Sequence, residues 1–128
     1  MFEATARLKI RDCELEGFKR QAAEVMRLMR ELDDPPLRYE WFLSDDGTTC
    51  EVREAYVDAD ALLAHQVKIA DAKIRLVRDF VVGHTMTFYS EPSPALAQAL
   101  NAMGTSFTVF SFLQGIDSDI DVLDEVPA

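Results

Sequence analysis

The sequence has little of several features that mark specialised protein classes. Only two cysteines, five glycines and five prolines occur among 128 residues, so neither a disulfide scaffold, a collagen-like chain nor a low-complexity segment is expected. No apolar run approaches the roughly 18 residues that a membrane span needs, and the N-terminus lacks the basic and apolar regions of a signal peptide. We therefore expect a cytoplasmic protein with no membrane partner, in which Cys13 and Cys50 are reduced thiols.

Basic residues are also scarce, since the chain has 13 lysines and arginines against 23 aspartates and glutamates, which gives a net charge of −10. Such a field repels nucleic acid and anionic membrane surfaces, so neither is an expected partner. The two histidines, His65 and His84, have no acidic or cysteine ligand in register, and no metal site is predicted. The acidic segment 117–121 lacks the glycine of a calcium loop, and we expect a solvated tail there.

The hydrophobic content of 48% and the length predict one globular domain over residues 1–128. Apolar residues alternate over 4–10, which predicts a strand, and recur at helical spacing over 13–32, with Asp12 as the expected cap. Two prolines end that helix. Strands are predicted over 37–44 and 49–56, joined by an Asp45-Asp46-Gly47 turn.

The second half of the chain begins with a helical region over 58–80, capped by Asp58 or Asp60. This region carries two apolar stripes that lie nearly opposite each other on a straight helix. Either the helix is sandwiched between two partners or it breaks near Ala70, and we favour a break into helices 58–68 and 71–80. A strand over 85–90, a helix over 95–103 and a strand over 106–113 are predicted to follow.

This order predicts an α+β domain, a ferredoxin-like βαββαβ arrangement with an added αβ extension and an antiparallel sheet. With helices on one face only, the other face carries either Tyr39, Trp41 and Leu43 or Phe42 with the charged residues. A face with large apolar groups needs a cover. The simplest cover is a second copy of the chain, so a homodimer is predicted.

Three side chains that can exchange protons fall within twelve residues at the predicted strand-to-helix corner: Glu54, Tyr56 and His65. His65 is a candidate general base, or a structural histidine that ties the helix to the sheet. Glu54 shares a face with apolar residues and needs a partner, either His65 in a catalytic dyad or a cross-strand structural pair. Tyr56, Trp41 and Tyr39 are candidate substrate-binding residues or core residues. His84 follows Gly83 at the entrance to a strand, from where it either reaches the pocket or lies on the surface, and the surface position is the one we favour.

The segment from Tyr39 to His65 resembles the antibiotic biosynthesis monooxygenase superfamily. The resemblance rests on the Tyr39-Glu-Trp strand, the Ser44-Asp-Asp-Gly turn, the Glu54-Ala-Tyr strand end and the Asp58…Ala61…His65 helix, within about the first 70 residues. It implies a dimeric α+β barrel with a pocket between the sheet and the helices. Family members include cofactor-independent oxygenases of quinol-like aromatics and haem-degrading enzymes.

The sequence departs from the haem-degrading pattern of Asn, Trp and His, because its only asparagine, Asn101, lies in a late predicted helix. Haem is therefore a minor alternative, and no glycine-rich dinucleotide fingerprint is present, so no cofactor is predicted. The leading hypothesis is a cofactor-independent monooxygenase for a small aromatic or quinol-type molecule. The competing hypothesis is a non-enzymatic homodimer that binds a small ligand or has a structural role.

Overall fold

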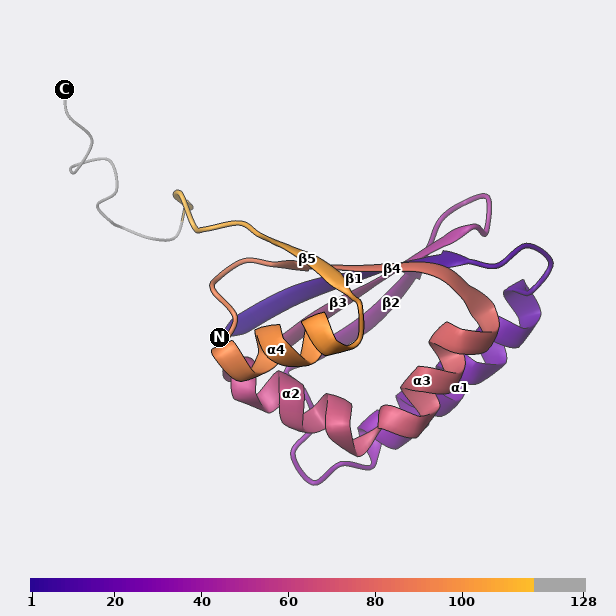
Figure 1. The fold of residues 1–128 in the computed structure, drawn as a ribbon, viewed down its shortest axis with the longest axis horizontal. Coiled ribbons are helices and arrows are strands. Elements are labelled where there is room, and N and C mark those ends of the chain that lie inside the picture. Colours follow the sequence, from indigo (N-terminus) through magenta and orange to yellow (C-terminus); the bar gives the residue numbers. More distant parts are fainter. Residues whose placement is uncertain (117–128) are drawn as a thin grey trace.

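The structure, a computed structural model, describes residues 1–116 (Figure 1). Its elements follow the chain in the order β1 (Phe2–Ile10), α1 (Leu15–Arg30), β2 (Arg38–Leu43), β3 (Thr49–Tyr56), α2 (Ala59–Lys68), α3 (Ala70–Phe80), β4 (Val81–Phe88), α4 (Pro94–Ala102) and β5 (Ser106–Val109). This order confirms the ferredoxin-like βαββαβ prediction with its αβ extension. The predicted acidic tail at 117–121 lies outside the described residues.

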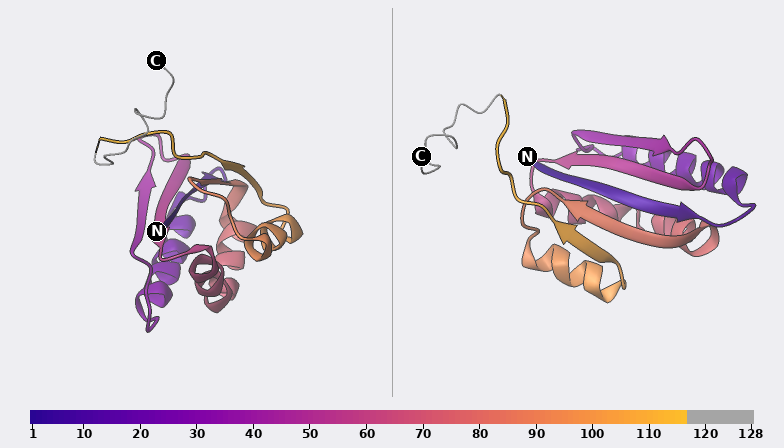
Figure 2. Two further views of the ribbon diagram at one scale, coloured as in Figure 1. Left: turned by 90° about the vertical axis from the view of Figure 1, so that its left-hand side faces the viewer. Right: turned by 90° about the horizontal axis from the view of Figure 1, so that it is seen from above.

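The strands form one five-stranded sheet in the order β2-β3-β1-β4-β5, and the helices cover one of its faces (Figure 2). The first four strands pair antiparallel. β5 pairs parallel with β4, so the sheet is mixed and the prediction of a wholly antiparallel sheet is wrong. The reason is the connection: α4 lies between β4 and β5 and returns the chain to the end where β4 began, as in any crossover between parallel strands.

Side chains alternate between the two faces of the sheet, and the alternation settles which residues face the helices. Ala4, Ala6 and Leu8 of β1 are buried on the helix-facing side. Tyr39 and Trp41 pack against that core, whereas Phe42 is 51% exposed on the other face with charged neighbours. Of the two alternatives for the open face, the one with Phe42 and the charged residues is therefore confirmed.

The long helical region breaks at Ile69, as favoured from its two apolar stripes. Ile69 leaves helical geometry at ψ 18° and is buried beside Val25 and Met29 of α1. The stripe of Leu62, Ile69 and Leu76 is buried on the two shorter helices, whereas Val67 and Ile74 of the other stripe are exposed. The Asp58 side chain accepts a hydrogen bond from the Ala61 backbone amide at 2.8 Å, so Asp58 is the cap of α2.

Three predicted boundaries are wrong. Asp12 does not cap α1, because Cys13 takes a left-handed conformation (φ 66°) and the helix starts after Glu14, with no side-chain cap. β4 begins at Val81 rather than at 85, because β1 continues to Ile10 and pairs with Val81 beyond a register shift. β5 ends at Val109 rather than at 113, since its pairing with β4 ends at Phe88.

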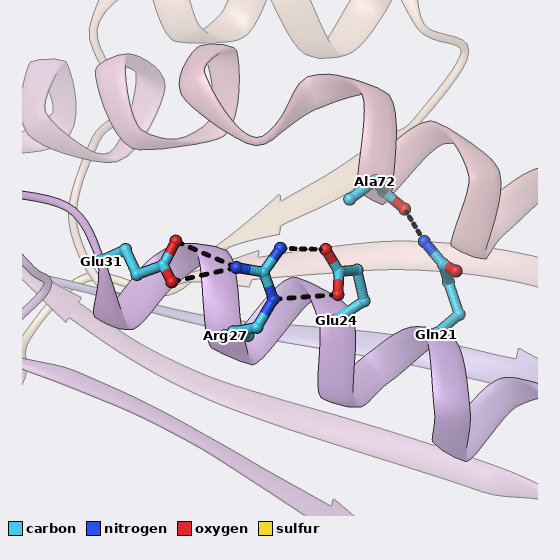
Figure 3. Close-up of polar contacts among 5 residues, drawn as sticks. All are labelled: Gln21, Glu24, Arg27, Glu31 and Ala72. Carbon is cyan, nitrogen blue, oxygen red and sulfur yellow. Dashed lines mark hydrogen bonds and ion pairs between the residues drawn. The ribbon is translucent and has the colours of Figure 1, made fainter.

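The helix layer is tied together by a hydrogen bond between α1 and α3 (Figure 3). Gln21 Nε2 donates to the Ala72 carbonyl oxygen at 3.0 Å. On the exposed side of α1, Arg27 donates to both Glu24 and Glu31, an arrangement that lowers the pKa of the Glu24 carboxyl through the Arg27 hydrogen bond. Exposed ion pairs of this kind contribute little to stability. Among residues 1–116, no helix has both the length and the apolar character that crossing a membrane requires.

Candidate functional site

The helix-facing side of β2 and β3 carries a buried acidic group between two phenols. Glu54 is 2% exposed and lies on β3 directly opposite Tyr39 of β2. The hydroxyl of Tyr56, two residues further along the same face, donates to Glu54 Oε1 at 2.8 Å. The period-two alternation of β3 places Glu54 and Tyr56 side by side, and antiparallel pairing adds Tyr39.

A buried lysine on α3 faces this acid. Lys73 is 8% exposed, and its Nζ donates to Gln66 Oε1 of α2 at 3.2 Å. Burial raises the pKa of the Glu54 carboxyl, although the Lys73 charge and the Tyr56 hydrogen bond oppose that change. Burial likewise lowers the pKa of the Lys73 ammonium, against the opposing effect of Glu54. Desolvation therefore moves both groups toward their neutral forms.

Among residues 1–116 no hydrogen bond or ion pair joins the two groups, and each acts on the pKa of the other through its charge. In one form a carboxylate faces an ammonium, and in the other a carboxylic acid faces a free amine. In the second form the pair offers a proton donor and a proton acceptor in the same small volume. Buried groups with pKa values moved by desolvation and by a specific charged partner are typical of functional sites.

The phenols of the cluster stay protonated. Burial, followed by the charge of Glu54, raises the pKa of the Tyr56 hydroxyl. Burial also raises the pKa of Tyr39 well above its ordinary value, with a further contribution from Glu54. Both hydroxyls are therefore hydrogen-bond donors rather than bases at neutral pH.

Unpartnered polar atoms gather in the same interior layer. Within residues 1–116, five buried side-chain atoms have no hydrogen-bond partner: Tyr39 Oη, Trp41 Nε1, Glu54 Oε2, His65 Nδ1 and His84 Nε2. Buried polar groups are nearly always hydrogen-bonded in folded proteins. Five exceptions between one sheet face and its helices therefore mark this layer as a place for a polar ligand or for solvent.

His65 is buried next to the cluster but does not form the predicted pair with Glu54. Its Nε2 contacts the Asp34 carbonyl oxygen, in the loop between α1 and β2. Its ring lies over Tyr56 at a centroid distance of 5.3 Å. The structure thus brings Glu54 together with Tyr56 and Lys73, and it places His65 behind Tyr56.

Trp41 and Tyr39 form the aromatic end of this layer. Their rings meet edge to face at 5.8 Å, and Trp41 also lies 6.2 Å from Phe18 of α1. Both residues pack against the hydrophobic core. Their carbon surfaces have a packing role, and the polar atom of each remains free to bind a ligand.

A half-open cavity of about 280 Å³ reaches this layer between α3, β4 and the turn after α4. Lys73, His84 and Thr105 supply its polar groups, Ile74, Val77 and Met103 its apolar walls, and Arg78 also lines it. Burial, aided by the Lys73 charge, lowers the pKa of His84 to about 4. The surface position expected for His84 is wrong, because β4 starts early enough to turn that side chain inward opposite Leu8. None of the residues predicted from the sequence as catalytic or substrate-binding lines this cavity, namely His65, Glu54, Tyr56, Trp41 and Tyr39.

Two members of the site, Lys73 and His84, were not predicted from the sequence. A signal for Lys73 exists, because it lies four residues after Ile69 and three before Leu76, on the stripe that is buried in the structure. A lysine at that position of an apolar stripe is a candidate buried cation. His84 had no comparable signal, since its inward direction depends on the register of β4 against β1.

No protein-family model matches the sequence, and no curated protein matches it either. Solved structures do resemble it. MupZ from Pseudomonas fluorescens superposes with a TM-score of 0.69 at 24% identity, over 98% of this chain and 92% of that one. A crystal structure of an antibiotic biosynthesis monooxygenase gives a TM-score of 0.63 at 14% identity, over 73% of this chain and 100% of the other. Rv0793 from Mycobacterium tuberculosis gives 0.60 at 17% identity, over 73% and 97%.

These structural matches bear out the resemblance stated from the sequence. The chain has the α+β fold of antibiotic biosynthesis monooxygenases, with an extra C-terminal strand on a mixed sheet. At identities this low the likeness concerns the fold. Since one fold hosts many reactions, the chemistry has to be argued from the side chains of the buried layer.

Proposed function

We propose that this protein is an enzyme that oxidises a small phenol or quinol-type aromatic with dioxygen and without a bound cofactor. The observation that carries the proposal is the buried acid–base pair of Glu54 and Lys73, with Lys73 lining a cavity open to small molecules. The fold shared with an antibiotic biosynthesis monooxygenase supports the same class of reaction.

The reaction begins with loss of the phenolic proton. A phenol in the cavity transfers this proton to the free amine of Lys73, which lines the cavity, and the resulting phenolate lies beside the Lys73 ammonium. The electron-rich ring carbon para to the oxygen then gives one electron to dioxygen, and the two radicals combine to form a carbon–oxygen bond. Loss of water from this peroxide breaks the O–O bond. Phenol and O2 thus become quinone and water, with no external reductant.

The other residues of the layer have supporting roles in this scheme. Tyr56 holds the Glu54 carboxyl in place, and His65 supports the Tyr56 ring from behind. Glu54 acts on Lys73 through its charge, and His65, predicted from the sequence as the dyad partner of Glu54, has a positioning role. Tyr39 and Trp41 keep unpartnered donor groups in the buried layer, and neither lines the cavity. The apolar walls keep water from the reactive anion.

The working form in this proposal is a cytoplasmic homodimer, in which a second copy covers the open sheet face. That face carries Phe42 at 51% exposure among charged residues. A two-fold contact buries the same patch on both copies. Sedimentation at micromolar concentration that shows only a monomer would contradict the dimer.

Oxygen uptake with naphthols and dihydroxynaphthalenes tests the reaction. We expect one O2 consumed per quinone formed, and one labelled oxygen atom in the quinone when 18O2 is supplied. Removal of a general base typically costs about 10²–10⁴ in rate, so Glu54→Gln and Lys73→Met should lose at least about a hundredfold. Arg75→Gln, an exposed cation on the same helix, is the matched control with unchanged rate.

Two results would contradict this assignment. Full activity in Glu54→Gln would remove the acid–base pair from the mechanism. A loss in His65→Ala as large as that in Glu54→Gln, with the fold intact, would restore His65 as the base.

The second candidate is a non-enzymatic homodimer that binds a small ligand. The tight burial of Glu54 and Tyr56, at 2% and 1% exposed, favours it, because much of the layer is already filled by side chains. Calorimetric binding of the same aromatics, with no oxygen uptake at any pH between 6 and 9, would support this candidate over the enzyme.

A further inference from the structure

One lysine of this chain lies in a different environment from the other three. Lys9, Lys19 and Lys68 are exposed, whereas Lys73 is 8% exposed and lines the cavity between α3 and β4. We propose that Lys73 forms a Schiff base with small aldehydes or ketones that enter this cavity. This covalent activity does not depend on the oxidation proposed above, and it assigns carbonyl compounds as a further ligand class.

The surroundings of Lys73 suit attack on a carbonyl carbon. The cavity of about 280 Å³ has room for a single-ring compound, and its walls at Ile74, Val77 and Met103 are apolar. Of the hydrogen bonds that the ammonium can donate, one goes to Gln66 at 3.2 Å. The His84 Nε2 atom on the adjacent strand is buried without a partner, so it can hydrogen-bond the carbonyl oxygen of a bound compound.

The chemistry requires a free amine and a nearby acid. The Lys73 lone pair attacks the carbonyl carbon and forms a C–N bond, while the carbonyl oxygen takes a proton. The carbinolamine then loses that oxygen as water, after a second protonation, and the amine gives up its protons to become an imine. Glu54 is the acidic group whose charge acts on Lys73, and because Glu54 does not line the half-open cavity, solvent at the cavity mouth carries the protons. The balance is carbonyl plus amine giving imine plus water, with no redox partner.

Burial supplies the free amine. An ordinary lysine is almost wholly an ammonium at neutral pH, and desolvation lowers the pKa of Lys73. Desolvated lysines in apolar pockets are the usual Schiff-base nucleophiles. Each unit by which the pKa falls raises the free-amine fraction about tenfold.

Reductive trapping tests the proposal directly. The full-length protein is treated at pH 7 with benzaldehyde and cyanoborohydride, which converts an imine into a stable benzyl-lysine, and peptide masses locate the label. The three exposed lysines are internal controls in the same sample. We expect Lys73 to be labelled faster than each of them, and this preference to vanish when the chain is unfolded in urea.

Two further samples make the result decisive. In Lys73→Met the fast-labelled site should disappear while the slow labelling of the other three lysines continues. In Ile74→Trp, at a position 54% exposed at the cavity mouth, labelling of Lys73 alone should slow. Labelling of Lys73 at or below the rate of the exposed lysines in the folded protein would overturn the proposal. That outcome would leave the oxygen-uptake test untouched, so the two can fail separately.

Discussion

The pairing of Glu54 with Lys73 predicts opposite pH dependences for two single substitutions. Both side chains are buried, at 2% and 8% exposed, and each is the main charged neighbour of the other. Lys73→Met leaves the Glu54 carboxyl buried without its cation. Glu54→Gln leaves the Lys73 ammonium buried without its anion. A buried charge that loses its partner becomes neutral rather than remain ionised.

The cost of becoming neutral sets the size of each effect. Protonating a carboxyl of ordinary pKa 4.5 at pH 7 costs about 3.4 kcal/mol, which is the ceiling for the charge effect of Lys73→Met. Deprotonating an amine of ordinary pKa 10.5 at pH 7 costs about 4.8 kcal/mol, the ceiling for Glu54→Gln. The double variant buries no charge, so its loss should be smaller than the sum of the two single losses.

The signs follow from the protons that each state binds. In Lys73→Met the folded state holds the Glu54 proton and the unfolded state has lost it, so stability falls as pH rises above 4.5. In Glu54→Gln the unfolded state holds the Lys73 proton and the folded state does not, so stability is lost as pH falls below 10.5. Each slope is at most about 1.4 kcal/mol per pH unit. The wild-type pair keeps one proton in both states and contributes no slope near pH 7.

Urea unfolding at pH 6, 7 and 8, followed by the fluorescence of the single tryptophan Trp41, measures these slopes. Relative to wild type, the free energy of unfolding of Lys73→Met should fall with pH and that of Glu54→Gln should rise. Two variants whose pH profiles run parallel to the wild type would show that Glu54 and Lys73 are not buried together as ionisable groups.

Three further substitutions probe other features. The pKa of His84 is lowered to about 4 in the folded state, so the unfolded state takes up a proton first as the pH falls. Between pH 6.5 and 4, the free energy of unfolding of the wild type should fall by on the order of 3 kcal/mol relative to that of His84→Gln, as measured by urea titration. Asp58→Ala removes the α2 cap and should cost about 1 kcal/mol, whereas Asp60→Ala should cost less, by thermal unfolding. Gly17→Ala places a methyl group on the Phe80 ring and should destabilise by about 1–3 kcal/mol, and unchanged stability would contradict that contact.

Local patterns were sufficient to predict most of the elements. The hairpin turn has Gly47 at φ 72°, the conformation that the Asp-Asp-Gly turn predicts. The opposed stripes of the long helical region predicted its break, which the structure has at Ile69. Where prediction failed, as at the start of β4 and at the Asp12 cap, the outcome depended on pairing with β1 or on a single left-handed residue.

The candidate site was predictable only in part. Glu54 and Tyr56 share a face because β3 is a strand, and that follows from a period of two. The partner of Glu54 does not follow, since Lys73 is nineteen residues away on a separate helix and His65 was the nearer candidate in sequence. Only the packing of α3 on the sheet shows that Lys73 faces the acid.

The sequence by itself determined the order of the elements, the break in the long helical region, and which side chains of each strand share a face, because these depend on local periodicity and turn chemistry. The tertiary structure decided the parallel pairing of β5, the inward direction of His84 and the choice of Lys73 as the charged neighbour of Glu54. Those features depend on strand register and on which helix lies over which strand. Such contacts join residues far apart in the chain, and the free energy of the whole packed layer selects them rather than any local pattern.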